Sequence, residues 1–152
     1  MAQGDVHMFD QFLVDALEKV HNLETDTIKL ALVTATTTPA TTTAVPTWGS
    51  GGTTNFSSNE VSAGGNYSAG GAACANPTVA LSGGAATFDT DDPATWSQHA
   101  SNPSNARWAI LYNDTSTNKS CIAYVDLGSA FDMTTGDLTV AWGAPLATFD
   151  QA

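Results

Sequence analysis

The hydrophobic positions near the start of the chain repeat with the period of an α-helix. Apolar side chains recur at intervals of three and four residues from position 9 to position 20, with mostly polar side chains between them. This spacing predicts one amphipathic helix over residues 6–22, with Asp5 as N-cap and Lys19 and His21 near the negative C-terminal pole. Its apolar stripe has two alternative roles, packing on the domain's own sheet or docking against a partner chain. The stripe residues that we assign as a candidate contact surface are Phe9, Phe12, Leu13 and Leu17.

Beyond residue 22 the helical period does not return, and short apolar runs alternate with polar turns. The runs of strand length are residues 27–34, 78–81, 85–89, 94–98, 107–112, 121–126 and 138–142. Ser82-Gly83-Gly84 predicts the turn of a hairpin. Many short strands without alternating helices indicate a mainly β fold, an antiparallel β-sandwich of jelly-roll type. We expect a single domain over residues 1–152, with an N-terminal helical arm (1–24) and the sandwich (25–152).

Long loops rich in Gly and Thr interrupt the strands. Residues 36–47 hold many threonines and two prolines, and residues 47–71 are rich in Gly, Ser, Asn and Thr. Flexible linkers of this composition seldom carry large apolar side chains, but this segment carries Trp48, Phe56 and Tyr67. We therefore expect an ordered, loop-rich part of the same domain rather than a linker.

Charge excludes one class of partner. The chain has 152 residues, with 15 Asp and Glu against 4 Lys and Arg, and a formal net charge of −11. This charge repels a phosphate backbone, so nucleic acid is not an expected partner. No apolar run approaches the roughly 18 residues of a membrane span, and the first residues lack the features of a secretory signal. We expect a soluble chain that is made in the cytoplasm and has no membrane partner.

Few residues are arranged for chemistry. His7, His21 and His99 are far apart in the chain, and no nucleotide-binding or nucleophile motif accompanies them. We therefore expect no enzymatic activity and no cofactor. Cys74 and Cys121 do not form a CxxC motif. We expect two buried free thiols, with a disulfide left open for a protein that reaches the outside of a cell.

The densest group of charges is an acidic cluster between two predicted strands, formed by Asp89, Asp91 and Asp92. Clustered carboxylates can bind calcium, but the Gly and Glu positions of an EF-hand loop are missing. Pro93 follows directly and favours a turn, where Asp is common because its side chain bonds to nearby backbone. We expect a turn in which Arg107 pairs with one of these carboxylates, and a cation site is the weaker alternative.

The four tryptophans divide into two groups. Trp96, Trp108 and Trp142 lie in predicted strands and are expected in the core. Trp48 stands in a Gly-rich loop, and we expect it to be exposed at an interface. An exposed aromatic platform can also stack on sugar rings, so a carbohydrate-binding β-sandwich is an alternative function.

Five segments, in this order, resemble a family of small virion proteins of tailed bacteriophages. They are DTIKLALV (26–33), NEVSAGGNYSAGG (59–71), ATFDTDDPATWS (86–97), ARWAILYND (106–114) and GDLTVAW (136–142). The resemblance covers most of the chain from Asp26 to Trp142. It implies a capsid decoration, or cement, protein that clamps neighbouring subunits of the major capsid protein.

The resemblance also implies partners and a location. A decoration protein of this kind is a non-enzymatic homotrimer on the capsid surface of the virion. It is synthesised in the host cytoplasm before it binds the capsid. We assign the helix stripe and the loop 39–52, with Trp48, as the contact regions. The alternatives are a tail, neck or head-fibre component of the same particle, and a carbohydrate-binding sandwich that contacts the host surface.

Overall fold

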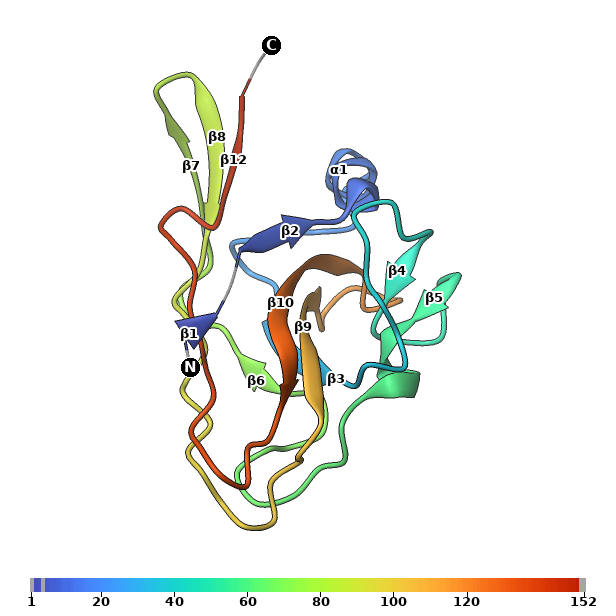
Figure 1. The fold of residues 1–152 in the computed structure, drawn as a ribbon. Helices are drawn as coiled ribbons and strands as arrows, with labels where there is room; N and C mark the ends of the chain where they lie inside the picture. Colours follow the sequence, from blue (N-terminus) through green and yellow to red (C-terminus); the bar gives the residue numbers. More distant parts are fainter. Residues whose placement is uncertain (1, 4, 151–152) are drawn as a thin grey trace.

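The computed structural model describes residues 2–3 and 5–150, and its fold is mainly β with antiparallel sheets and one short N-terminal helix, as predicted. The largest element is a five-stranded antiparallel sheet in the order β2-β10-β9-β3-β6 (Figure 1). Its strands are β2 (Val6–Met8), β3 (Ile28–Val33), β6 (Ala72–Ala73), β9 (Ala106–Asn113) and β10 (Cys121–Phe131).

A second antiparallel sheet, in the order β12-β8-β7, stands out from one side of the body (Figure 1). It consists of β7 (Thr78–Ser82), β8 (Ala85–Asp89) and β12 (Ala147–Phe149). β7 and β8 form the predicted hairpin, and its turn residues Gly83 and Gly84 both have positive φ, which glycine adopts without strain. The parallel pairs are β1 (Ala2–Gln3) with β11 (Thr139–Val140), and β4 (Pro46–Thr47) with β5 (Thr54–Asn55).

The central sheet is buried on both faces because successive side chains of a strand point to opposite sides. In β3, Leu30 and Leu32 enter one apolar cluster, whereas Ala31 and Val33 enter the other. β9 divides between the same two clusters. Burial on both faces explains why these strands are continuous apolar runs in the sequence rather than alternating ones.

Helix α1 (Asp10–Leu17) begins later than predicted. Residues 6–8 form β2, which pairs with β10 from Met8 opposite Ala123 to Val6 opposite Val125. Hydrogen bonding to the sheet thus replaces the first turn of the predicted helix, and the N-cap is Phe9 rather than Asp5. The N-terminal segment is therefore built into the central sheet and is not a separate arm.

The helix also ends earlier than predicted, at Leu17, and Lys19 lies just beyond the C-cap residue Glu18. Lys19 has a φ of 60°, in the left-handed region. Its amide donates to the carbonyl oxygen of Ala16, and the amide of Val20 donates to that of Asp15 at 2.9 Å. This pattern of two bonds is a Schellman motif, which closes a helix.

The Gly- and Thr-rich segment is ordered, as expected, because its large side chains anchor it to the sheet. The hydroxyl of Tyr67 accepts the amide of Leu32 at 3.0 Å and donates to a carboxylate oxygen of Glu60 at 2.9 Å. Phe56, in the 3-10 helix η1 (Phe56–Asn59), is buried in the second cluster. A loop that places aromatic side chains in the core has a fixed path over the sheet.

Two of the predicted strands are only partly formed. The expected strand at residues 94–98 is reduced to a single bridge between Trp96 and Leu138. The expected strand at 138–142 is the two-residue β11. Of the three tryptophans expected in the core, Trp96 is buried, and Trp108 and Trp142 are partly buried against the two clusters.

Candidate functional site: an apolar groove

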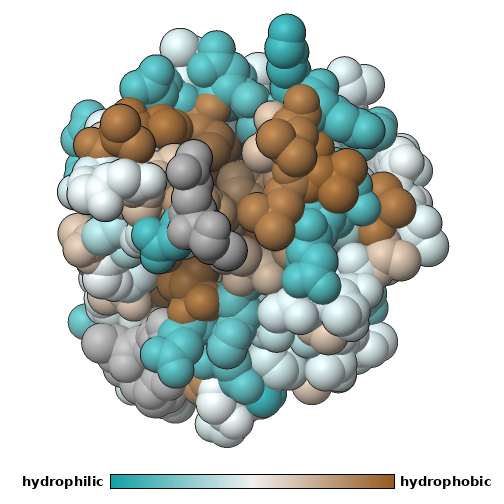
Figure 2. Space-filling view, turned by 90° about the horizontal axis from the view of Figure 1, so that it is seen from above, coloured by the Kyte–Doolittle hydropathy of each residue, from teal (hydrophilic) through white to brown (hydrophobic). Residues whose placement is uncertain are grey.

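An apolar groove of about 450 Å³ separates α1 from the three-stranded sheet. Figure 2 shows hydrophobic side chains on this face of the molecule, on two sides of a hollow. The groove lies between α1 and the three-stranded sheet, both of which stand above the central body in Figure 1. Its lining residues are Phe12, Leu13, Ala16, Leu17, Leu23, Val79, Ala86, Thr87, Phe88 and Phe149.

The predicted stripe of α1 divides between the core and this surface. Phe9 and Phe12 are fully buried, one in each apolar cluster, and the ring of Phe12 lies 5.9 Å from that of Phe149. Leu13 is 51% exposed and Leu17 is 86% exposed. The two phenylalanines therefore hold the helix in place, and the two leucines are free to meet a partner.

The sheet side of the groove was not among the predicted contact residues. Val79 is 43% exposed and Leu81 is 80% exposed, both on β7. The alternation of apolar and small side chains in TVALS is the usual signal of a strand with one buried face. Nothing in that pattern indicates that the covering layer is missing at the tip of the hairpin.

Trp48 is not an exposed interface residue. It is only 4% exposed and stacks on the ring of Tyr112, with 5.0 Å between centroids. Its backbone amide donates to Lys119 at 2.8 Å. The prediction of an exposed Trp48 rested on the Gly-rich composition of its loop. Composition does not show that the loop packs over Tyr112 on β9. With Trp48 buried, the proposed aromatic platform for sugar loses its exposed member.

The three aspartates of the acidic cluster each bind a different part of the backbone or a neighbouring side chain. Asp89 accepts the amide of Leu146, and Asp92 accepts the amide of Trp142. Asp91 accepts the side-chain amide of Asn76 at 2.6 Å. Among residues 2–3 and 5–150, no three His, Cys, Asp or Glu side chains gather in a way that could hold a metal ion. Residues 90–95 form neither a regular turn nor a strand, so these carboxylates fix irregular backbone rather than the predicted turn.

Arg107 does not pair with this cluster. Its guanidinium bonds to Asp126 on the neighbouring strand β10 and lies over the ring of Trp108, 3.9 Å from its centroid. The hydrogen bond from Arg107 holds the pKa of the Asp126 carboxyl below its ordinary value. The prediction failed because cross-strand pairing brings position 126 beside position 107, which sequence proximity does not reveal.

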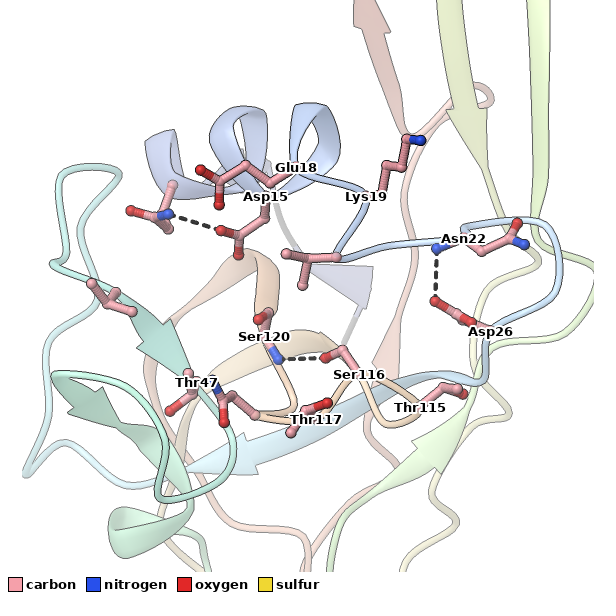
Figure 3. A pocket seen from close by; sticks show the side chains of 14 residues that line it. Asp15, Glu18, Lys19, Asn22, Asp26, Thr47, Thr115, Ser116, Thr117 and Ser120 are labelled. Carbon is pink, nitrogen blue, oxygen red and sulfur yellow. Dashed lines mark hydrogen bonds between the residues drawn. The ribbon is translucent and has the colours of Figure 1, made fainter.

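A polar pocket of about 560 Å³ lies on the other side of α1, between the helix and the turn before β10 (Figure 3). Asp15 and Glu18 point toward it from the helix end, and Ser116 and Ser120 lie on the turn below. The Ser116 hydroxyl accepts the amide of Ser120 at 2.9 Å. This bond ties the turn together locally.

Next to this pocket, a fully buried His21 side chain joins the N-terminal segment to β9. Its Nδ1 lies 3.0 Å from the side-chain nitrogen of Asn113, and its Nε2 lies 3.9 Å from a carboxylate oxygen of Asp15. Asn113 also donates to Asp26 at 2.6 Å. Burial lowers the pKa of His21, against the opposing effect of the charges of Asp15 and Asp26. Burial thus favours the neutral form of this ring.

Both cysteines are buried and free, and they sit in opposite clusters of the central sheet, Cys74 in one and Cys121 in the other. Burial raises the pKa of Cys74 to about 12 and also raises that of Cys121. A sheet therefore separates two protonated thiols, and the disulfide left open by the sequence is not formed.

Comparison of the chain with protein-family models, with curated proteins and with solved structures found no match. Within the part of the chain that the structure describes, no helix has the length and apolar character needed to cross a membrane.

Proposed function

We propose that the protein is a bacteriophage capsid decoration protein, a non-enzymatic component that binds the lattice of the major capsid protein and stabilises the head. In this proposal it acts as a homotrimer on the capsid surface of the virion. The ordered set of five segments that resembles small virion proteins supports the assignment. The observation that carries it is the uncovered apolar surface beside α1 and β7.

Exposed apolar surface of this kind is unfavourable in water, and the free energy is lowered when a partner covers it. Large apolar side chains that are grouped on one face mark protein-interaction sites, whereas scattered ones are ordinary. Full burial of a leucine contributes about 1.5–3 kcal/mol. Leu13 and Leu17 could therefore anchor a contact of moderate strength, and many copies on one shell add such contacts by multivalency.

Charge fits the same function. The formal net charge of −11 keeps free subunits apart and soluble before assembly. The groove itself is lined almost entirely by apolar side chains, so docking there does not require burial of these charges. An acidic protein with a neutral contact surface can stay dispersed and still bind a lattice.

Copy number tests the proposal against its main alternative. Purified particles are analysed by quantitative mass spectrometry for copies of this chain relative to the major capsid protein. A number comparable to that of the major capsid protein supports a shell-wide decoration. A few to a few dozen copies would place the chain in the tail, neck or head fibres, and absence from particles would reject a virion role.

The contact surface is tested with Leu17→Asp, which places a charge at a position that is 86% exposed. We expect this variant to fold normally and to bind capsids that lack the decoration at least tenfold more weakly, measured by co-sedimentation. Thr117→Asp, on the exposed turn before β10, is the matched control and should bind as the wild type does. Equal binding by both variants would show that α1 does not contact the lattice.

A further inference from the structure

The polar pocket beside α1 gathers negative charge from two sides. Three of the side chains that line its volume of about 560 Å³ are carboxylates. Asp15 and Glu18 come from the end of α1, and Asp26 comes from the segment before β3 (Figure 3). Among the described residues that line the pocket, the only basic side chain is that of Lys19, which points away from Asp15 in Figure 3.

The carboxylate of Asp15 is buried without a positively charged partner. Asp15 is 8% exposed, and its Oδ1 accepts the side-chain amide of Gln11 at 2.8 Å. Its Oδ2 accepts no hydrogen bond from the described residues and faces Nε2 of His21 at 3.9 Å, an atom that also lacks a hydrogen-bond partner. Burial lowers the pKa of His21 from the ordinary value of 6.5, so this ring supplies no full charge at neutral pH. Buried carboxylates are ordinarily paired with a cation.

The other basic side chains of the protein are engaged elsewhere. The chain holds four Lys and Arg. Lys29 and Lys119 both pair with Asp114, and Arg107 pairs with Asp126. A cation for the polar pocket must therefore come from another molecule, and a net charge of −11 attracts cations to this protein.

The arrangement of the carboxylates favours an extended cation over a metal ion. Among residues 2–3 and 5–150, no three His, Cys, Asp or Glu side chains gather in a way that could hold a metal ion. Asp26, away from the helix, accepts only uncharged donors, the amide of Asn22 at 2.8 Å and the side chain of Asn113 at 2.6 Å. Two separated carboxylate sites match a ligand with two separated positive charges.

Linear diamines and polyamines have this form. Each terminal ammonium group brings three hydrogen-bond donors and no acceptor, as the lysine side chain does. Val20 and Val45 also line the pocket and offer apolar contacts for the carbon chain between the two charges. The hydroxyl of Ser116 lies on the turn below the helix and adds an uncharged oxygen to the lining.

We propose that the polar pocket binds a linear diamine or polyamine, with one ammonium group at Asp15 and Glu18 and another at Asp26. The pocket is separate from the apolar groove, so this inference goes beyond the proposed function and does not depend on it. A ligand held at both places ties the end of α1 to the segment before β3. It thereby steadies the helix that carries Leu13 and Leu17.

Isothermal titration calorimetry of the purified chain with diaminopropane, diaminobutane, diaminopentane and diaminohexane, each with two terminal amino groups, tests the site. We expect one length to bind more tightly than its neighbours and at least tenfold more tightly than butylamine, which has a single ammonium group. General attraction to a chain of net charge −11 depends on ligand charge and hardly on length. Equal affinity across the series, or no binding, would therefore overturn the proposal.

Calcium chloride is titrated in the same way as a comparison. Tighter binding of calcium than of every diamine, lost in Asp15→Asn, would assign the pocket to a metal ion and would also overturn the proposal. None of these outcomes affects the capsid proposal, which is decided by copy number on particles.

Variants locate the binding. Asp15→Asn and Asp26→Asn each remove one charge and keep an oxygen that can accept the existing hydrogen bonds. We expect each to weaken binding of the preferred diamine at least tenfold. Glu18→Gln changes an exposed residue, should weaken binding about threefold, and decides the test if a buried variant does not fold.

Asp5→Asn is the matched control. It removes the same charge from an exposed residue that does not line the pocket, and it should bind the diamine as the wild type does. Circular dichroism checks that every variant is folded. Unchanged binding in folded Asp15→Asn and in Glu18→Gln, or an equal loss in Asp5→Asn, would place the diamine elsewhere and contradict the proposal.

Discussion

At Gly71 the Gly-rich loop passes so close to β3 that a side chain has no room. A Cβ placed there would lie 2.0 Å from the carbonyl oxygen of Leu30, and the residue has a φ of +73°. Only glycine satisfies both conditions, because other residues meet a steric penalty at positive φ even in open space. This position fixes the path of a loop that would otherwise resemble a linker.

Gly71→Ala should therefore lower the free energy of unfolding by about 3 kcal/mol, the sum of left-handed strain and the steric overlap. Gly83→Ala is the matched control, because Gly83 has a φ of +59° and no atom within 4 Å of an added Cβ. The control should lose only about 1 kcal/mol. Urea denaturation measures both variants, and equal losses would show that the loop moves away from β3 at little cost.

His21 predicts a pH dependence of stability. Burial lowers its pKa in the folded protein from the ordinary value of 6.5, so the unfolded chain binds the proton more tightly. The stabilisation from the neutral ring is complete above the unfolded pKa and is lost as the pH falls below it. We expect His21→Gln to lose less stability than the wild type between about pH 7 and about pH 5. The free energies of unfolding are measured by urea denaturation. An equal loss in the two proteins across this pH range would contradict that role.

At the scale of elements, the end of α1 depends on one residue in an unfavourable conformation. Lys19 occupies the left-handed position of the Schellman motif, where glycine is preferred. We expect Lys19→Gly to raise the free energy of unfolding by about 1 kcal/mol. Lys19→Ala removes the same charge without relieving the strain, and it should bring no gain. Thermal denaturation of both variants compares the two effects, and an equal gain in Lys19→Ala would assign the effect to charge.

The element scale also shows where pattern and structure agree. The runs at 27–34, 107–112 and 121–126 became β3, β9 and β10, and Ser82-Gly83-Gly84 marked the hairpin turn. These elements could be predicted because an apolar run or a turn glycine indicates a structure within its own few residues. The first turn of the predicted helix does not form, because Val6–Met8 pairs with β10 instead. A partner strand more than a hundred positions away decides that choice.

At the scale of the whole molecule, charge opposes every contact between copies. A net charge of −11 repels a second copy over distances of about one Debye length, which shortens from about 30 Å at 0.01 M salt to about 8 Å at 0.15 M. We therefore expect added NaCl to increase the associated fraction of the purified chain, measured by sedimentation velocity. Dissociation on addition of salt would instead indicate ion pairs between copies.

By itself the sequence determined the mainly β class, the central strands, the hairpin and the acidic surface, because these follow from local periodicity, turn residues and composition. Only the tertiary structure decided which apolar positions are covered. Phe12 and Leu17 belong to one predicted stripe, yet one is buried and the other is 86% exposed. Periodicity marks a face as apolar, but burial depends on what packs against that face, and that neighbour comes from a distant part of the chain or from another molecule.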